Sequence, residues 1–361
     1  MYKCEEMSSV RQIIACQSVQ ILIYLFRMED DNMLNIVILD GYTVNPGDLS
    51  WDRISSLGNV TVYDRTRPEE VEDRARDAEI LLTNKTVLSE EILCRLPKVT
   101  YIGALSTGTN VIDLPTAMQR NITVTNIPEY ATFATAQMTI ALLLEWANQV
   151  GSHSRLVAEG KWSHSVDFSF TDGRLTELAG LTLGLFGYGK IAKRVAAIAH
   201  ALGMRVLASS RRIEAACIEK DTHAFCDPFV DAFVKMTDLL RMADIISFHC
   251  PLTPDTKNIV CAQTIAQMKD GVFLLNTARG QLFCEKDVAD ALHTGKIAGI
   301  GVDVLSTEPP NEDSPLLQAP NCIITPHIAW APQETRARLL ETAYQNLLAY
   351  LSSRPQNVVL P

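Results

Sequence analysis

The chain has 361 residues, a length that suggests about two domains at roughly 150 residues each. Lys and Arg total 32 and Asp and Glu total 42, so the net charge is −10, which argues against a dedicated nucleic-acid binder. The chain is 47% hydrophobic and 20% charged, an ordinary globular composition that excludes wholesale disorder. Its nine cysteines show no CxxC pair and no metal-type spacing, so we expect free thiols, a cytoplasmic protein and no metal site.

Residues 1–32 differ in character from the rest of the chain. Their apolar run, residues 21–26, is too short to span a bilayer, which takes about 20 apolar residues. Acidic residues follow it, where a signal peptide would have a small-residue cleavage site. Few Lys or Arg residues flank the run, which argues against a membrane-surface anchor. We expect an extension outside the fold, or translation that begins at Met33, and no membrane partner.

Short runs rich in Val and Ile then alternate with segments of helical period. The first series of expected strands covers residues 35–39, 60–63, 80–83, 101–104 and 123–126. A long helix over residues 135–151 precedes a second series, at 181–186, 205–209, 245–249, 272–276, 299–304 and 322–325. An amphipathic helix over residues 333–351 follows. This alternation is typical of parallel sheets covered by helices, so we predict an α/β protein with two Rossmann-like, doubly wound domains and a ligand cleft between them.

The strongest local motif is GxGxxA, which lies between an expected strand and an expected helix. Gly187 would allow a tight turn, Gly189 would let the backbone approach a pyrophosphate, and Ala192 would allow close packing. Lys190 precedes and Ile191 opens the helix expected over residues 191–202, whose amino end offers N–H groups to an anion. The motif predicts a dinucleotide site, and the alternative is a glycine turn required only for packing.

The end of the next expected strand bears on the choice of dinucleotide. An Asp or Glu about 20 residues past the glycines is typical of NAD sites. Here Ser210, Arg211 and Arg212 stand at that point, and no acid occurs before Glu214. Small hydroxyls followed by two guanidinium groups would accept a 2′-phosphate through charge-assisted bonds, which favours NADP over NAD. The alternative is that both arginines are solvated loop cations.

Three further polar segments follow later strands, where chemistry belongs in an open α/β sheet. The first carries Arg279, the second Asp303 and Glu308, and the third His327. Taken singly, each has a structural explanation. A histidine after a strand is more often packed than catalytic, and an arginine can cap a helix.

Together with the glycine loop, these segments resemble the D-isomer-specific 2-hydroxyacid dehydrogenase family, over all but the N-terminal extension. Residues 39–42 and 326–330 are most similar to the glycerate dehydrogenase (hydroxypyruvate reductase) branch. The resemblance implies a discontinuous substrate-binding domain, residues 33–132 and 319–361. A dinucleotide-binding domain, residues 133–318, would be inserted between its two parts.

The family's catalytic roles map onto three residues of this chain. His327 would be the general acid that protonates the keto oxygen as hydride arrives. Glu308 would bond the other ring nitrogen, and Arg279 would grip the substrate carboxylate. The resemblance implies NAD(P)H-dependent reduction of a small 2-keto acid, hydroxypyruvate or glyoxylate, to the D-2-hydroxy acid. It also implies a homodimer formed at the long helix, with Trp146 and Trp162 nearby.

The remaining expected contacts also come from the resemblance. The substrate would meet a carboxylate-binding loop and three later residues: Ser106, Thr107, Gly108, Arg279, His327 and Trp330. The cofactor would meet Thr107, Gly187, Gly189, Lys190, Ile191, Ser210, Arg211, Arg212, Cys250, Thr277, Ala278, Asp303 and Ala329. Of these, Asp303 would bond the nicotinamide carboxamide, and Cys250 would be a wall residue because nothing in its neighbourhood would activate a thiolate.

Other functions of the same fold are weighed against this one. A D-lactate-type dehydrogenase stays open, because the side-chain pocket is not legible from one sequence. Glu308 argues against a formate dehydrogenase, and the short stretch after His327 argues against the regulatory extension of a phosphoglycerate dehydrogenase. Dinucleotide-sensing corepressors share the fold and the catalytic-looking residues, but they add long tails that we do not find in this sequence.

Overall fold

The computed structural model describes residues 33–219 and 226–360, so the expected N-terminal extension, residues 1–32, lies outside the described residues. Contacts within the chain define two compact units. Among the described residues, the first comprises those up to Tyr130 together with those from Gln333 onward, and the second is Ala131–Pro332. No helix in the described ranges is long and apolar enough to cross a membrane.

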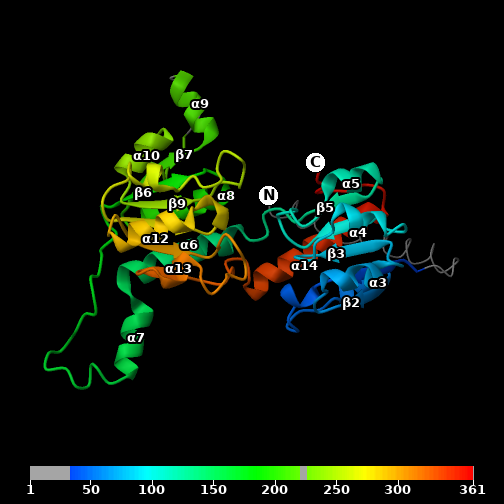
Figure 1. The fold of residues 1–361 in the computed structure, drawn as a ribbon, viewed down its shortest axis with the longest axis horizontal. Coiled ribbons are helices and arrows are strands. Elements are labelled where there is room, and N and C mark those ends of the chain that lie inside the picture. The colour runs from blue at the N-terminus through cyan, green and yellow to red at the C-terminus, as the bar shows by residue number, and fades with distance from the viewer. Residues whose placement is uncertain (1–32, 220–225, 361) are drawn as a thin grey trace, which may run out of the picture. The chain divides into compact units, whose positions relative to one another are not determined.

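The first unit is built on a five-stranded parallel sheet in the order β2-β1-β3-β4-β5 (Figure 1). Its strands are β1 Asn35–Ile38, β2 Asn59–Val62, β3 Ile80–Thr83, β4 Tyr101–Ala104 and β5 Thr123–Thr125. Its helices are η1 Gly41–Thr43, α2 Asp52–Ser55, η2 Pro68–Glu70, α3 Val71–Ala75, α4 Glu90–Cys94, α5 Leu114–Gln119 and α14 Gln333–Leu351. All residues of β3 and β4 are buried, because helices cover both faces of a parallel sheet.

The second unit is built on a seven-stranded parallel sheet in the order β12-β11-β10-β9-β6-β7-β8. Its strands are β6 Thr182–Phe186, β7 Arg205–Ser209, β8 Ala232–Phe233, β9 Ile245–Phe248, β10 Val272–Asn276, β11 Ile297–Val302 and β12 Cys322–Ile324. Its helices are α6 Thr132–Asn148, α7 Val150–Ala158, α8 Lys190–Ala201, α9 Arg211–Glu219, α10 Met236–Met242, α11 Ala262–Ile265, η3 Gly280–Leu282, α12 Glu285–His293 and α13 Pro315–Gln318. The two sheets confirm the α/β expectation.

Side chains alternate between two cores on the faces of the larger sheet. Leu183 and Leu185 of β6 belong to the core beneath α6 and α8. Gly184 lies between them and faces α10, where a Cβ atom would meet Leu239 at 2.8 Å. The glycine therefore lets α10 pack directly on the sheet. Because β6 has β7 on one side and β9 on the other, the chain changes winding direction at this strand, and a crevice is expected at the carboxyl ends of β6 and β9.

Two boundaries differ from the sequence expectations. The predicted helix over residues 135–151 is divided at Gln149, whose left-handed backbone (φ 50°) ends α6 and precedes α7. The second segment of the first unit begins at Gln333 instead of residue 319. The reason is that β12 pairs with β11 and so belongs to the seven-stranded sheet.

Candidate active site

The glycine loop lies where β6 and β9 end side by side. Gly187 has a φ of +92°, and a Cβ atom there would lie 2.7 Å from both the carbonyl carbon of His249 and the backbone nitrogen of Cys250. Any other residue would be strained and would push the two strand ends apart. The backbone N–H of His249 donates to the carbonyl of Phe186 at 2.8 Å, which holds the two strand ends in register.

The rest of the loop leaves room for a ligand. Gly189 is exposed, and a Cβ atom built on it would have no neighbour within 4 Å. No side chain caps the amino end of α8, which begins at Lys190, while Ala192 is fully buried beneath it. An open glycine beside an uncapped helix start fits the pyrophosphate of a dinucleotide, because backbone N–H groups and the helix dipole favour an anion there.

The residues expected at the ribose follow β7. Ser210 accepts a hydrogen bond from the backbone N–H of Ile213 at 3.4 Å, which helps to begin α9. Arg211 and Arg212 open α9 and have exposed side chains. The two guanidinium groups are therefore free to meet an anion at the carboxyl end of the strand.

The segment after β10 makes a tight turn and then touches the segment after β11. Asn276 donates from its amide to the Arg279 carbonyl at 2.8 Å and accepts from the Ala278 N–H at 3.0 Å. The Arg279 side chain is exposed. At the next residue, Gly280, a Cβ atom would lie 1.9 Å from the carbonyl carbon of Leu305, so only glycine allows this approach of two backbones.

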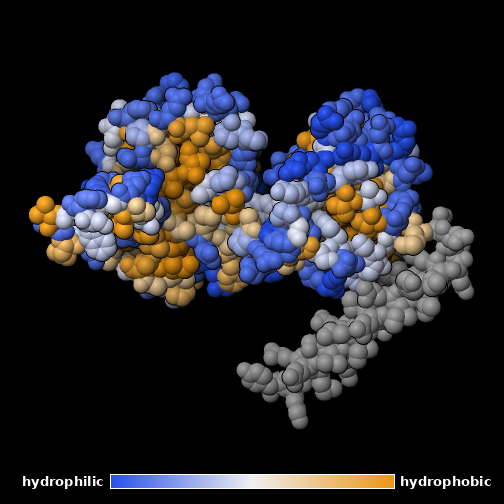
Figure 2. All heavy atoms as spheres, turned by 90° about the horizontal axis from the view of Figure 1, so that it is seen from below, coloured by the Kyte–Doolittle hydropathy of each residue, from blue (hydrophilic) through white to orange (hydrophobic). Residues whose placement is uncertain are grey.

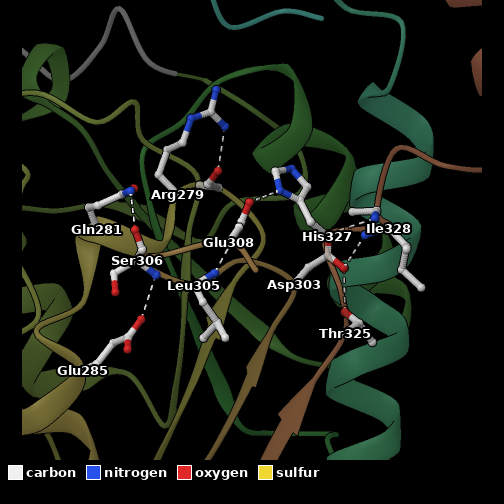
Figure 3. A network of polar contacts seen from close by, with 12 residues as sticks. Arg279, Gln281, Glu285, Asp303, Leu305, Ser306, Glu308, Thr325, His327 and Ile328 are labelled. Atoms are coloured by element: carbon white, nitrogen blue, oxygen red, sulfur yellow. Dashed lines mark hydrogen bonds and ion pairs between the residues drawn. The ribbon is translucent and has the colours of Figure 1, made fainter. Parts of the chain in front are cut away.

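Glu308 and His327 form the central contact of the site (Figure 3). Glu308 Oε2 lies 2.6 Å from His327 Nδ1, and Glu308 Oε1 accepts the Leu305 N–H at 3.0 Å. Since a carboxylate accepts, Nδ1 carries a proton and Nε2 faces away from this bond. The side chains of Glu308 and His327 are 34% and 32% exposed, so neither is sealed inside the unit.

A second carboxylate, Asp303, shapes the turn that carries His327 (Figure 3). One of its oxygens accepts from the Thr325 hydroxyl at 2.6 Å and from the Ile328 N–H at 2.9 Å. The other accepts from the Ala329 N–H at 2.8 Å. His327 has a φ of 54°, a left-handed conformation that costs energy for a residue with a side chain. The three bonds to Asp303 hold the chain in that conformation.

Two groups beside the glycine loop are kept neutral by burial. Burial lowers the pKa of His249 to about 4, and its Nε2 lies 2.9 Å from the Ser247 hydroxyl. Burial also raises the pKa of the Cys250 thiol to about 11. A neutral imidazole and an un-ionised thiol fit a wall of the crevice and not a nucleophile.

In the first unit, the loop of Ser106, Thr107 and Gly108 has its carbonyl groups occupied. They accept from Ile127 N–H, the Asn126 amide and the Ser106 hydroxyl, respectively. Among the described residues, the backbone N–H groups of Thr107 and Gly108 have no partner. Two free N–H groups in one turn suit a carboxylate.

The structure thus brings Arg279, Asp303, Glu308 and His327 together through strand ends of the second unit, whereas the loop with Ser106 belongs to the first. Of the other expected contacts, Thr277 is buried against Thr139 (hydroxyl oxygens 2.8 Å apart), Ala278 and Trp330 are half-buried, and Ala329 is buried.

The sequence interpretation missed Gln281 and Glu285, which also contact the loop of Glu308. An acid in the first turn of α12 was the available signal, but it also favours the helix dipole by itself.

Comparison with known proteins identifies the family. Residues 140–329 match the NAD binding domain of D-isomer specific 2-hydroxyacid dehydrogenases. A hydroxypyruvate reductase from Blautia hydrogenotrophica is 46% identical over 333 residues, which cover 90% of this chain and 99% of the relative. The chain belongs to the D-isomer specific 2-hydroxyacid dehydrogenase family.

Another relative and a solved structure are also similar to this chain. A glycerate dehydrogenase from Methylorubrum extorquens is 37% identical, with coverage of 81% of this chain and 88% of the relative. The crystal structure of the TT0316 protein from Thermus thermophilus has a TM-score of 0.76 and 33% identity, over 91% of this chain and 100% of that one. The dehydrogenase is therefore an oxidoreductase that uses a nicotinamide dinucleotide.

The two loop glycines predict opposite behaviour on substitution. Gly189→Ala should raise the Kd for a nicotinamide dinucleotide by about tenfold or more, since its Cβ would occupy open space needed by the pyrophosphate. The Tm without ligand should not change, because no atom lies within 4 Å. Gly187→Ala should instead lower the Tm of the ligand-free protein. Titration by nicotinamide fluorescence and thermal unfolding measure both, and wild-type affinity in Gly189→Ala would contradict the placement.

Proposed function

We propose that this dehydrogenase reduces hydroxypyruvate or glyoxylate to the corresponding D-2-hydroxy acid. The observation that supports the proposal best is the bond between Glu308 and His327, which leaves Nε2 free to take up a second proton and donate it at the carboxyl end of the sheet. The relatives named hydroxypyruvate reductase and glycerate dehydrogenase support the choice of substrate.

His327 and Glu308 would act as one unit during reduction. The bound nicotinamide dinucleotide supplies the hydride to the keto carbon. His327 donates its Nε2 proton to the keto oxygen, which becomes the hydroxyl, and takes that proton back when the reaction runs in reverse. Glu308 holds the ring orientation through Nδ1 and stabilises the imidazolium before the proton leaves.

Arg279 and the first unit's loop would hold the substrate. The exposed guanidinium of Arg279 offers a planar fork to the substrate carboxylate and polarises the keto group. In the first unit, the free N–H groups of Thr107 and Gly108 would suit a substrate carboxylate, with Ser106 shaping the loop. Trp330 would close the substrate pocket from the turn that carries His327.

The expected cofactor contacts remain part of the proposal. The dinucleotide's phosphates would lie on the loop from Gly187 to Ile191, with Cys250 as a wall and Thr107, Thr277, Ala278 and Ala329 near the ribose and nicotinamide. Asp303 would bond the carboxamide. Its bonds to the turn use three of the roughly four acceptor positions of a carboxylate, which leaves one for this contact.

The proposed compartment is the cytoplasm, supported by the free cysteines among the described residues.

The proposed reaction is tested by nicotinamide absorbance with hydroxypyruvate, glyoxylate and pyruvate. We expect fast oxidation of the reduced cofactor with hydroxypyruvate or glyoxylate, whereas preference for pyruvate would indicate a D-lactate-type enzyme.

His327→Ala should lower kcat by roughly 10²- to 10⁴-fold without changing the Kd of the dinucleotide, since only the proton donor is lost. His293→Ala is the matched control, because its ring bonds the Ala289 carbonyl within α12. Lost dinucleotide binding in His327→Ala would contradict the assigned role.

We further propose that NADPH is preferred over NADH. The support is the pair of exposed guanidinium groups after Ser210, with no carboxylate at the position that usually binds the ribose hydroxyls. Charge-assisted bonds to a phosphate contribute about 1.5–3 kcal/mol each. Replacing both Arg211 and Arg212 by Ala should therefore lower kcat/KM for NADPH by roughly tenfold or more and leave NADH unaffected.

The control for this prediction is Arg205→Ala, which removes an exposed cation from the amino end of the same strand. Steady-state kinetics with both cofactors measure the effect. A wild-type enzyme that prefers NADH would contradict the proposal and leave the arginines as surface charge.

A homodimer is the proposed assembly. No residue of α7 is buried in its own unit, and the segment after it exposes Val166 completely and Phe168 to 92%. Hydrophobic residues accordingly lie at the left edge of the view in Figure 2, where this segment extends from the second unit. Trp162 is half-exposed in the same segment, whereas Trp146 stacks on Phe273 inside the unit, with ring centroids 4.3 Å apart. Exposed apolar groups on one extended segment are typical of a surface that a partner covers.

Sedimentation equilibrium tests the assembly. We expect the mass of a dimer for the wild type and of a monomer for a variant with Val166→Asp and Phe168→Asp, because both charges would be buried at the contact. Met118→Asp, an exposed apolar position of the first unit, should remain a dimer. A monomeric wild type would refute the proposal.

A further inference from the structure

The loop that carries Glu308 lies between β11 and α13 and has no regular secondary structure of its own. Glu308 is one-third exposed, so packing alone does not fix its carboxylate. One restraint on it within the loop is the Leu305 N–H, which donates to Oε1 at 3.0 Å. The position of the carboxylate that faces His327 therefore depends on what holds Leu305 and its neighbour Ser306.

Ser306 is held from both sides by one short segment. The N–H of Ser306 donates to Glu285 Oε1 at 2.7 Å, and the carbonyl of Ser306 accepts from the Gln281 amide at 2.8 Å. The second oxygen of Glu285 accepts from the Ser314 hydroxyl at 3.2 Å, near the far end of the loop. Figure 3 shows Gln281 and Glu285 on either side of the Ser306 backbone. The two side chains thus close the loop at its start, and Glu285 also holds its end.

The same segment begins with Arg279. Gly280 lies between Arg279 and Gln281, with its backbone against Leu305 and Ser306. A displacement of the loop would therefore change the distance from Glu308 to His327 and would disturb the backbone beside Arg279. Errors of about 1 Å at a reacting centre can cost a hundredfold in rate.

We propose that Glu285, assisted by Gln281, is a positioning residue that sets the Glu308–His327 pair for proton transfer. This inference rests on the proposed function of that pair. Glu285 acts through the Ser306 and Leu305 backbone and does not touch the substrate. Both of its oxygens accept hydrogen bonds, so the position requires an acceptor that reaches Ser306 and a polar group that reaches Ser314.

Two substitutions of Glu285 separate this role from charge. Glu285→Ala removes both bonds and should lower kcat by roughly tenfold to a hundredfold, with an unchanged KM for the dinucleotide. Glu285→Gln keeps an acceptor for the Ser306 N–H, and its amide can donate to the Ser314 hydroxyl, so it should stay within about threefold of the wild type. Gln281→Ala should give a smaller loss of the same kind.

Asp287→Ala is the matched control. Asp287 is an acid in the first turn of the same helix, and its carboxylate accepts the Ala262 N–H at 2.8 Å instead of a group of the Glu308 loop. It should alter Tm without lowering kcat. The kinetic isotope effect on kcat, measured with cofactor deuterated at the transferred hydrogen, should rise in Glu285→Ala because the chemical step becomes slower. A smaller folded fraction alone would leave that isotope effect unchanged.

The outcomes are distinct. Wild-type kcat in folded Glu285→Ala, or an equal loss in Asp287→Ala, would overturn the inference. If Glu285→Ala does not fold, an unchanged kcat in Gln281→Ala would overturn it. If the wild type reduces no keto acid, the proposed function fails, and the inference is then decided by the ¹⁵N shifts of the His327 ring. They should move in Glu285→Ala and not in Asp287→Ala, and unmoved shifts would overturn the inference.

Discussion

The contact of two backbones at Gly280 is the constraint on which the candidate site depends. A Cβ atom there would lie within 2.0 Å of the Leu305 carbonyl group, so the segments after β10 and β11 meet without a side chain between them. Parallel strands place their carboxyl ends at one edge of the sheet, and this contact then joins two of the loops that leave that edge. Arg279 lies next to the contact on one side, and the loop of Glu308 begins on the other. Gln281 and Glu285 follow Gly280 in the chain and bond Ser306, which follows Leu305.

Two carboxylates in the site have different surroundings and therefore different tasks. Asp303 is buried and accepts three hydrogen bonds from the turn that carries His327, so it orders the backbone. Glu308 is one-third exposed and directs one oxygen at the imidazole. A short bond from a carboxylate to Nδ1 selects the tautomer and supports positive charge on the ring. Asp303 holds the left-handed backbone at His327, and Glu308 orients the imidazole ring.

Local patterns predicted the strands well because buried parallel strands are continuous apolar runs. The expected ranges 80–83, 205–209 and 272–276 are those of β3, β7 and β10. The two-residue β8 was missed, since it has too few residues to show a period. Gln149 was also missed as a helix end, because a left-handed glutamine is not a usual stop signal. The second series of expected strands included residues 322–325, and β12 does join the larger sheet, but the domain boundary implied by the family resemblance put them in the first unit.

The sequence by itself determined the α/β class, the glycine loop and the family, because hydrophobic period, glycine spacing and short motifs are local properties of the chain. It also indicated Arg279, Glu308 and His327 as candidate site residues through their resemblance to that family. Only the tertiary structure decided how these groups are held. Gln281 and Glu285 reach Ser306 across 25 and 21 residues, and Glu308 reaches His327 across 19. Such contacts depend on the order of strands in the sheet and on the space left by one glycine, which no local pattern records.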